Sequence, residues 1–405
     1  MKFVPVWSYK WFKTDFFFAT LFLFISVFLL GLITFNLSFL NPISKALADF
    51  NFSDLLYSKL NTNQETIDTN IVLVNIGHLN RSQITEQLRI IKEHHPKIIG
   101  FDGFFAQRRD SAIDGHLRYQ FLEGNKVVMA CFLTGENEIS GEFDSLETSN
   151  PFFNSRLKGF VNLGGANPTA STVRKFSPIE VYKGDTLYAM AVQLARVYNP
   201  DAFRKLVNRK NDREIIRYIG NRDAFIGFDV VDIFDSLTDL NILKNKIVLM
   251  GYIGESFQHP PDLEDIYYTP MNPEISGRSR PDMYGVVIHA NIASMILSEN
   301  YINTMPVWLT ILISFMVCYF YIFFITWFKA RKPWLFEVVF PVFLLFFNVL
   351  IIYLFFLLYQ YYHYEIHSGY FLAPILLFPT FKTYYERSLM IIGRHIKINS
   401  IFLPK

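Results

Sequence analysis

The sequence has few cysteines and few charged residues for its length. Only two of its 405 residues are cysteine, Cys131 and Cys318, and the second falls within a long apolar run. A framework of disulfide bonds is therefore excluded. Charged residues make up 18% of the chain and the formal net charge is +2. This balance argues against a nucleic-acid-binding protein, which usually presents a basic surface.

The chain also lacks the motifs of common enzymes and cofactor sites. Residues 251–256 follow a predicted strand and contain two glycines, but they lack the Gly-Lys-Ser/Thr ending of a phosphate-binding loop. The Gly-x-Ser-x-Gly pattern of serine hydrolases is missing. No spacing of His, Cys, Asp or Glu matches a standard metal motif. We therefore expect no enzyme, no cofactor and no bound metal.

Long apolar runs are the main feature that the sequence does have. Apolar residues make up 51% of the chain, and about 20 of them in a row cross a bilayer as a helix. The predicted spans are residues 16–40, 307–328 and 335–359, with a short or broken fourth at 369–381. Pro374 and Pro379 interrupt that fourth segment. The first run is too long for a signal-peptide core, so we expect a retained anchor.

The distribution of Lys and Arg predicts how the chain is oriented. Basic residues lie before the first span (residues 1–15), in the turn at 329–332 and after the last span (residues 382–405). The loop at 360–368 has none. Because short cytoplasmic loops are enriched in Lys and Arg, both termini are predicted to be cytoplasmic and residues 42–305 to lie outside.

The outer segment is long enough for one large core and alternates between strand and helix patterns. The run at 71–76 is almost continuously apolar, as expected for a strand buried on both faces. Further strands are predicted at residues 97–102, 126–132, 159–163, 214–219 and 246–251, and helices at 43–60, 82–93, 186–198 and 285–299. Strand, helix and strand at this spacing form a βαβ unit. The fold class is therefore α/β, with a mostly parallel or mixed sheet and about four transmembrane helices.

Several stretches, taken in order, resemble the CHASE2 family, the second type of sensory extracellular domain associated with cyclases and histidine kinases. They are IVLVNI (71–76), PKIIGFD (96–102), KIVLMG (246–251), YTP (268–270) and MYGVVIHAN (283–291). The resemblance covers roughly residues 16 to 385, including one apolar helix before the domain and three after it. It departs from the family pattern at Gly77-His78 and at residues 168–171, where acidic residues are common in relatives.

The resemblance implies a sensory role and the inner membrane of a bacterium. Such domains usually control a cytoplasmic cyclase, kinase or phosphatase. Only about 20 residues follow the fourth apolar segment, too few for such a domain. We therefore expect the output to pass to another protein.

Three residues are the candidates for ligand binding. Asp102 ends a predicted strand, where α/β sheets place ligand groups, although it also suits a turn cap. His289 lies in the first turn of a predicted helix, where it suits a metal ligand, a pH switch or a buried structural residue. Asp262 belongs to an acidic loop with Glu264 and Asp265. A divalent-ion site made by these groups is a weaker alternative.

Two functions remain open on this evidence. The first is a sensory or regulatory membrane protein whose outer domain binds a ligand or partner and relays the change through its membrane helices. The second is a structural or accessory subunit of a cell-envelope complex, which binds proteins through its outer domain and its helices. Either protein contacts the lipid bilayer and is able to form homo-oligomers. A polar pocket on the outer domain would favour the first, and an exposed apolar patch the second.

Overall fold

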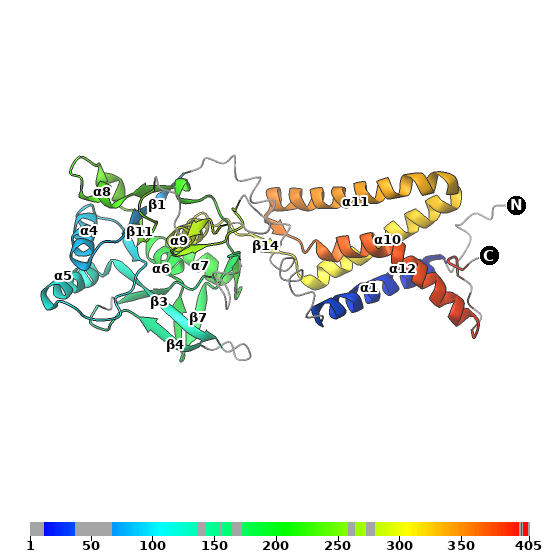
Figure 1. The fold of residues 1–405 in the computed structure, drawn as a ribbon, viewed down its shortest axis with the longest axis horizontal. Helices are drawn as coiled ribbons and strands as arrows, with labels where there is room; N and C mark the ends of the chain where they lie inside the picture. The colour runs from blue at the N-terminus through cyan, green and yellow to red at the C-terminus, as the bar shows by residue number, and fades with distance from the viewer. Residues whose placement is uncertain are drawn as a thin grey trace. The chain divides into compact units, whose positions relative to one another are not determined.

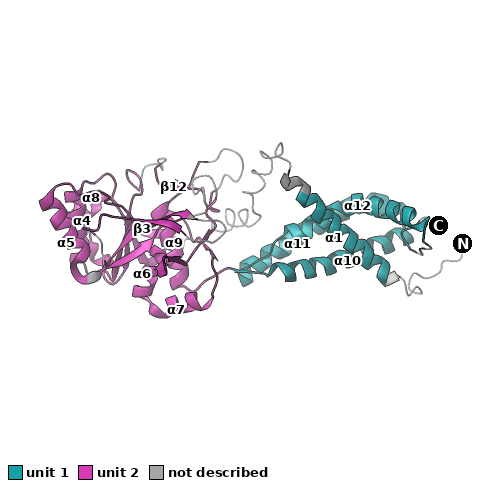
Figure 2. Cartoon of the chain, turned by 90° about the horizontal axis from the view of Figure 1, so that it is seen from below, with its two compact units in different colours: residues 1–48, 303–405 teal, residues 49–302 magenta. Residues whose placement is uncertain are grey.

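The computed structural model describes residues 12–36, 67–136, 143–153, 156–163, 172–257, 264–272, 280–396, 398 and 400–403. The chain divides into two compact units (Figure 2). One, the outer unit, is residues 49–302, and the other, the membrane unit, joins residues 1–48 to residues 303–405. The helix predicted at 43–60 lies outside the described residues.

The outer unit is built on a seven-stranded mixed sheet. Its strands are β10 (Phe225–Phe228), β1 (Asp68–Asn75), β11 (Ile247–Gly251), β2 (Ile98–Phe101), β3 (Val127–Glu136), β4 (Phe143–Thr148) and β5 (Leu157–Phe160). All neighbouring strands pair in parallel except β4, which is antiparallel to β3. The predicted mixed α/β fold is confirmed. The βαβ unit joins β1 to β2, and the later strand β11 inserts between them.

Helices cover both faces of this sheet (Figure 1). On one face α4 (Arg81–Glu93), α5 (Ser111–Leu122) and α8 (Val230–Phe234) share a core with alternate strand residues such as Val72 and Met250. The other face packs on α6 (Met190–Tyr198) and α9 (Gly285–Leu297). Because successive strand residues point to opposite faces, a strand between two helical layers must be apolar throughout. This explains the unbroken run at 71–76.

Local sequence sets the position of α4. Asn80 caps its N-terminus by accepting from Gln83 N at 3.0 Å, while the Gln83 side chain accepts from Asn80 N at 3.0 Å. The apolar residues Ile84, Leu88 and Ile91 follow at helical spacing and are buried. The helix is also tied to α5, because Arg81 Nη1 donates to the buried carboxylate of Asp114 at 2.7 Å.

Two glycines allow α6 to lie close to the sheet. A Cβ atom at Gly159 would lie 2.5 Å from Met190 Cα, the first residue of α6. A Cβ at Gly100 would lie 2.9 Å from Leu194 Cδ1 on the same helix. Since these distances are shorter than real Cβ contacts, a larger residue at either position would push the helix away from the sheet.

Two predicted elements differ from the structure. The helix predicted from residue 186 begins only at Met190, because the residues before it form a hairpin of β7 (Ile179–Tyr182) and β8 (Asp185–Tyr188). The strand predicted at 214–219 is reduced to β9 (Glu214–Ile215), paired with β6 (Lys175–Phe176). The remaining described elements of this unit are α7 (Pro200–Asn208), β12 (Ile266–Tyr267) and β13 (Met283–Tyr284), with short 3₁₀ turns at Glu123–Asn125, Arg222–Ala224 and Leu240–Leu243.

The described part of the membrane unit is a bundle of four helices. They are α1 (Phe12–Asn36), α10 (Val307–Arg331), α11 (Pro333–Tyr362) and α12 (Gly369–Gly393). By length and composition three helical segments, Thr14–Leu32, Val307–Arg331 and Pro333–Tyr362, are able to cross a membrane. Helix α12 runs unbroken through both of its prolines and continues past residue 381. That it crosses the membrane stays a prediction.

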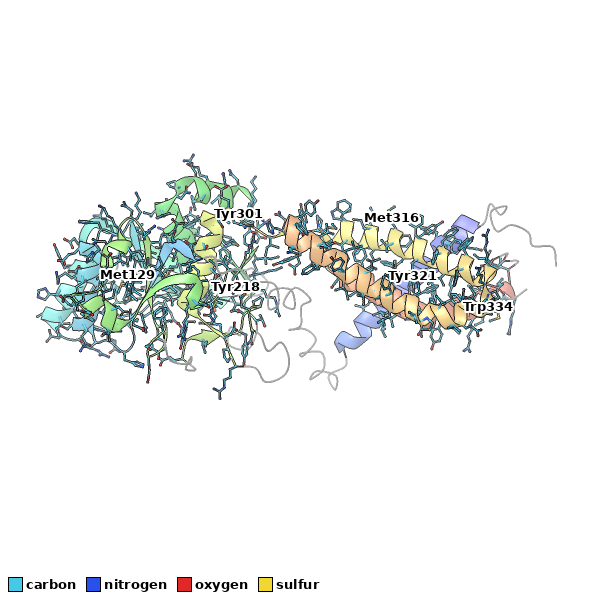
Figure 3. The ribbon with its side chains drawn as sticks, turned by 90° about the horizontal axis from the view of Figure 1, so that it is seen from above. Met129, Tyr218, Tyr301, Met316, Tyr321 and Trp334 are labelled. Atoms are coloured by element: carbon cyan, nitrogen blue, oxygen red, sulfur yellow. The ribbon has the colours of Figure 1, made fainter. Side chains whose placement is uncertain are left out.

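Aromatic side chains fill the interior of this bundle. Tyr321, labelled in Figure 3, stacks on Phe347 with ring centroids 5.3 Å apart and meets Phe378 edge-on at 5.8 Å. Phe16 of α1 is fully buried. Between helices in lipid, close packing of this kind replaces the hydrophobic effect as the attractive force.

A short parallel pair of strands ties the two loops of the bundle together. β14 (Asn303–Thr304) precedes α10, and β15 (Tyr364–Glu365) joins α11 to α12. Asn303 N donates to His363 O at 2.8 Å, and Met305 N donates to Glu365 O at 3.1 Å. The chain that enters α10 is therefore hydrogen-bonded to the chain that leaves α11.

Candidate functional site

The carboxyl ends of the central strands form the edge where the sequence places its candidate residues. β11 lies between β1 and β2, and the connections from these strands leave on opposite faces. β1 and β2 lead to α4 and α5, whereas β11 leads to α9 on the other face. In α/β sheets such a reversal opens a crevice outside the carboxyl ends, where ligands commonly bind.

The side chain of Asn75, at the end of β1, hydrogen-bonds to three segments of the chain at this edge. Its Oδ1 accepts from Gly77 N at 2.9 Å and from Ile253 N at 3.0 Å. Its Nδ2 donates to Gly254 O at 2.9 Å and to Asp229 Oδ1 at 3.2 Å. Every hydrogen-bonding position of this fully buried amide is therefore used inside the protein, which makes Asn75 a structural residue. The sequence analysis overlooked it, although an Asn that ends a buried apolar strand is a usable signal.

Asp102 and Asp265 come together at the same edge. Asp102 follows β2, and Asp265 lies just before β12 and beside the N-terminus of α9. A Cβ atom at Gly285, the first residue of that helix, would lie 3.2 Å from Asp265 Oδ2, and Gly285 N donates to Asp265 O at 3.1 Å. The Tyr267 hydroxyl donates to the Asp265 carboxylate. The helix N-terminus and this hydroxyl both favour a negative charge on Asp265.

Burial and mutual repulsion change the acidity of this pair. Burial raises the pKa of Asp102, and the neighbouring Asp265 raises it further. Burial also raises the pKa of Asp265, although the hydrogen bond from Tyr267 opposes the rise. The two carboxyl groups titrate as a pair, and the pair retains a proton at a pH where isolated carboxyl groups are ionised. A role of Asp102 in ligand binding stays a prediction.

His289 is buried in α9, with 2% of its surface exposed. Among the described residues, its Nδ1 atom has no hydrogen-bond partner. Burial lowers the pKa of His289 to about 4, so the imidazole is neutral at neutral pH and does not switch charge between pH 5 and 8. This agrees best with the structural reading of this residue. The third candidate, Asp262, lies outside the described residues.

The acidic residues of this region do not assemble a metal centre in the described part of the chain. There, no three His, Cys, Asp or Glu side chains are grouped so that they could hold a metal ion. Asp282 is used in another way, because it accepts from Thr269 N at 2.8 Å and from Thr269 Oγ1 at 2.5 Å. Burial raises the pKa of Asp282 to about 6.

A cavity lies at the opposite edge of the sheet, beside the amino-terminal end of β1. A cavity of about 320 Å³ is formed by the start of β1, residues 217–219 and the C-terminal part of α9. Asp68, Arg217 and Ser294 line it, together with Tyr218, which is labelled in Figure 3. Its volume falls at the lower end of the range for small-molecule sites. The sequence analysis overlooked this cavity, because its walls come from three segments that are far apart in the chain.

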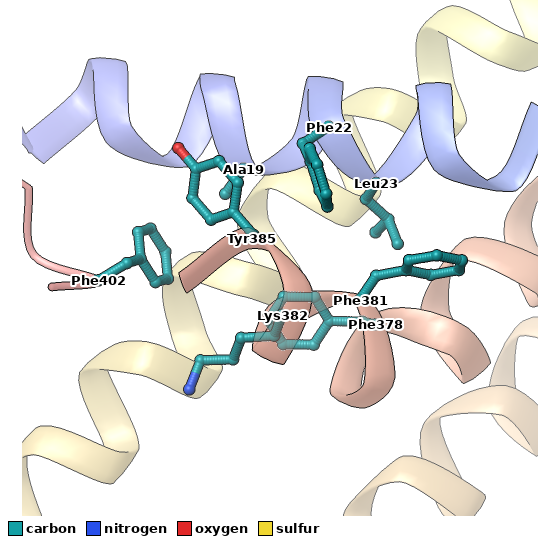
Figure 4. A pocket seen from close by; sticks show the side chains of 8 residues that line it. All are labelled: Ala19, Phe22, Leu23, Phe378, Phe381, Lys382, Tyr385 and Phe402. Carbon is teal, nitrogen blue, oxygen red and sulfur yellow. The ribbon is translucent and has the colours of Figure 1, made fainter. Parts of the chain in front are cut away.

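The described part of the membrane unit contains a much smaller gap. Rings from α1 and α12, together with Phe402, surround a space of about 10 Å³ (Figure 4). That is about the volume needed for one water molecule. Lys382 at its rim pairs with Glu386 at 3.1 Å. This gap is therefore a packing detail rather than a ligand site.

Comparison with known proteins identifies a family. The sequence model of the CHASE2 domain matches residues 20–326, which is most of the chain. The chain therefore belongs to the CHASE2 family, and the resemblance seen in the sequence is confirmed. Comparison with curated proteins gave no match. Comparison with solved structures gave none either.

The acid pair predicts that Asp102→Asn makes the outer unit more stable at high pH. A carboxyl group whose pKa is higher in the folded than in the unfolded state stabilises the fold when it is protonated. This contribution is complete only below its pKa in the unfolded state, about 4. That contribution is lost as pH rises through the folded pKa, by at most about 1.4 kcal/mol per pH unit. Because Asn cannot ionise, the free energy of unfolding of the variant should exceed that of the wild type by more at pH 8 than at pH 6.

Urea unfolding can be followed through the buried thiol of Cys131, the one cysteine of the outer unit, in a Cys318→Ala background. Labelling by a maleimide reports opening of β3, and comparing variants within each pH cancels the effect of thiol ionisation. The control is Asp185→Asn, at an exposed position on β8. An equal difference in unfolding free energy between Asp102→Asn and wild type at both pH values would contradict the raised pKa of Asp102.

Proposed function

Since the chain belongs to the CHASE2 family of sensory extracellular domains, we propose that it is a membrane-anchored sensor. Its outer unit binds a ligand or partner outside the cytoplasm. The resulting change passes through the membrane helices to a separate protein. A ligand shifts such an equilibrium only by its difference in affinity for the two states, and a tenfold preference corresponds to about 1.4 kcal/mol.

The observation that carries this proposal is the burial of α9 along almost its whole length. Every residue from Gly285 to Ile296 is buried, so this helix has no solvent-facing side. At 1.5 Å per residue it extends over about 20 Å. It begins beside Asp265 at one edge of the sheet and ends at the cavity beside Asp68. Because it is enclosed by its own domain, it moves only when the domain around it moves.

The chain then continues from α9 into the membrane unit without a flexible linker. Residues 298–306 contain no glycine, and they lead directly to α10 at Val307. Within this connection, Asn303 and Met305 are the residues hydrogen-bonded to the loop between α11 and α12. A displacement of residues 303–305 therefore acts on three helices of the bundle. These hydrogen bonds support the proposed relay.

The polar cavity favours a sensor over a structural subunit. A site that binds a small ligand needs an opening with convergent polar groups, and the cavity supplies a carboxylate, a guanidinium and hydroxyl groups. The outer unit does expose some apolar residues, notably Val231 (75% exposed) and Leu237 (90% exposed) near α8. Scattered exposed residues are common on monomeric proteins, so they weigh less than the cavity.

We also propose that the protein resides in the inner membrane of a bacterium with both termini in the cytoplasm. The basic turn at Lys329, Arg331 and Lys332 supports this orientation, and the loop at 360–368, which has no Lys or Arg, agrees with it.

The orientation predicts the labelling of two single cysteines. In a chain with Cys131→Ala and Cys318→Ala, we expect His367→Cys to react with an impermeant maleimide added to the outer face of the inner membrane. Lys332→Cys should react only after lysis. Both positions are exposed in the described structure, so access to water is matched. The reverse pattern would overturn the topology.

The sensor role is tested by purifying the tagged full-length protein in mild detergent and identifying the molecules that co-purify with it. Mass spectrometry of the tagged protein should find a bound small molecule, or a signalling protein in less than stoichiometric amount. The double variant Val231→Ser with Leu237→Ser should leave this composition unchanged. A stoichiometric envelope protein that this double variant removes would instead establish the subunit role.

A further inference from the structure

The helices α5, α4 and α8 form one layer on the outer unit, with α4 in the middle (Figure 1). Buried residues of all three helices share one core with the sheet. Apolar side chains remain exposed on both sides of α4, at Ile113 and Tyr119 of α5, at Val231 and Phe234 of α8, and at Leu237 just after α8. Exposed apolar residues alone carry little weight. Here, however, they lie among charges whose sign differs between the two sides.

The α5 side of the layer is basic. Arg108 and Arg118 both lie over the ring of Phe152, with their Cζ atoms 4.1 Å and 5.1 Å from its centre. Neither forms an ion pair with another described residue, because the nearby carboxylate of Asp114 is bonded to Arg81. Both arginines are exposed. A guanidinium that lies on an aromatic ring keeps its N–H groups available for a carboxylate.

The α8 side of the layer is acidic. Residues 224–243 contain four aspartates and no Lys, Arg or His. Asp229 is hydrogen-bonded inside the protein. The others, Asp232, Asp235 and Asp239, each accept one backbone N–H, and none of them forms an ion pair within the described residues. Asp235 and Asp239 are exposed beside the apolar residues.

Helix α4, between these two sides, pairs its own surface charges. Arg89 donates to Glu86 at 2.7 Å and is also paired with Glu93. The layer therefore changes from basic at α5, through internally paired charges at α4, to acidic at α8.

We propose that this layer is the contact surface between two copies of the chain. A twofold axis through α4 places α5 of each copy on α8 of the other, so that a basic side meets an acidic side twice. An interface with this symmetry must be complementary to itself, and the charge order of the layer meets that condition. Pairing in the opposite direction would bring like charges together, which fixes the orientation.

A second copy suits this surface better than an unrelated protein. Another protein would need both charges, in reversed order and at the same spacing. A copy of the layer turned by 180° already carries them in that order. The pairing does not depend on whether the outer unit binds a small ligand, and it goes beyond the proposed sensory role.

The contact is small, but the membrane makes a small contact sufficient. Helix α4 has 13 residues and is about 20 Å long, and three helices side by side span roughly 30 Å. The layer therefore offers on the order of 600 Å² per copy, compared with roughly 800 Å² in a standard interface. Two copies in one membrane are held at a high effective concentration, so a weak contact pairs them.

Cross-linking in native membranes tests the contact with its own charges. Two differently tagged full-length copies, both with Cys131→Ala and Cys318→Ala, carry Ile113→Cys in one and Val231→Cys in the other. A short bis-maleimide should join them at least about fivefold more than a control pair in which Asp185→Cys replaces Val231→Cys. Asp185 is exposed on β8, outside the layer. A yield no higher than the control would overturn the proposal.

Reversing the charges identifies what holds the copies together. One variant carries Arg108→Glu with Arg118→Glu, and the other carries Asp235→Lys with Asp239→Lys. Each variant paired with itself has like charges at both contacts, so its cross-linking should fall to the control yield. When the two variants are mixed, opposite charges meet at both contacts, and the yield should return to within about twofold of the original.

This rescue distinguishes a second copy from other occupants of the surface. An acidic protein or a polyanion that binds only the arginines would leave the mixed pair at the control yield, and that result would contradict the proposal. So would reversed variants that cross-link with themselves as well as the unreversed chains do. Protection of the buried Cys131 thiol from maleimide, in chains that retain it, shows that each reversed variant is folded. The first comparison uses the native charges and decides the contact independently of that folding.

Discussion

Enclosure of α9 is the constraint on which the rest of the outer unit depends. An ordinary surface helix has one apolar stripe, but here twelve consecutive residues are buried. Such a helix needs the sheet on one side and other elements around it, and α6, α7 and residues 217–220 supply these. Hydrogen bonds offset the cost of burying polar side chains within it, as at Asn291 and Ser294. Helix α9 therefore runs from one edge of the sheet to the opposite edge.

In the described residues the two edges are built differently. At the carboxyl edge Asn75 has every hydrogen-bonding position used within the protein, and Asp265 is bonded by Tyr267. At the amino edge the structure leaves a cavity of about 320 Å³ beside Asp68, which accepts hydrogen bonds from Asn70 and Ser294. The rule that α/β sheets bind ligands outside their carboxyl ends points to the first edge. The open volume points to the second, and the connection to the membrane helices lies there too.

Much of the fold could be predicted because periodicity and length determine it. Strands β1, β2, β3 and β11 and helices α4 and α9 were located within a few residues, since apolar runs between turns are informative. The β7–β8 hairpin was missed, because Leu187 and Tyr188 also fit the start of the helical pattern that follows. The insertion of β11 between β1 and β2 depends on contacts across the whole chain, which no local pattern encodes. The cavity was missed for the same reason, whereas the position of Asp102 directly after a strand was predicted, because a strand end is a local feature.

The most direct test of the relay is hydrogen exchange of the full-length protein in nanodiscs, comparing wild type with Thr69→Tyr, a substitution in the lining of the cavity. Filling the cavity should change the exchange of amides at the end of α9 and also of Asn303 and Met305, whose hydrogen bonds tie β14 to β15. This result would show that the outer unit and the membrane helices move together. A change confined to the cavity lining, with unchanged exchange at residues 303–305 and 363–365, would contradict the account.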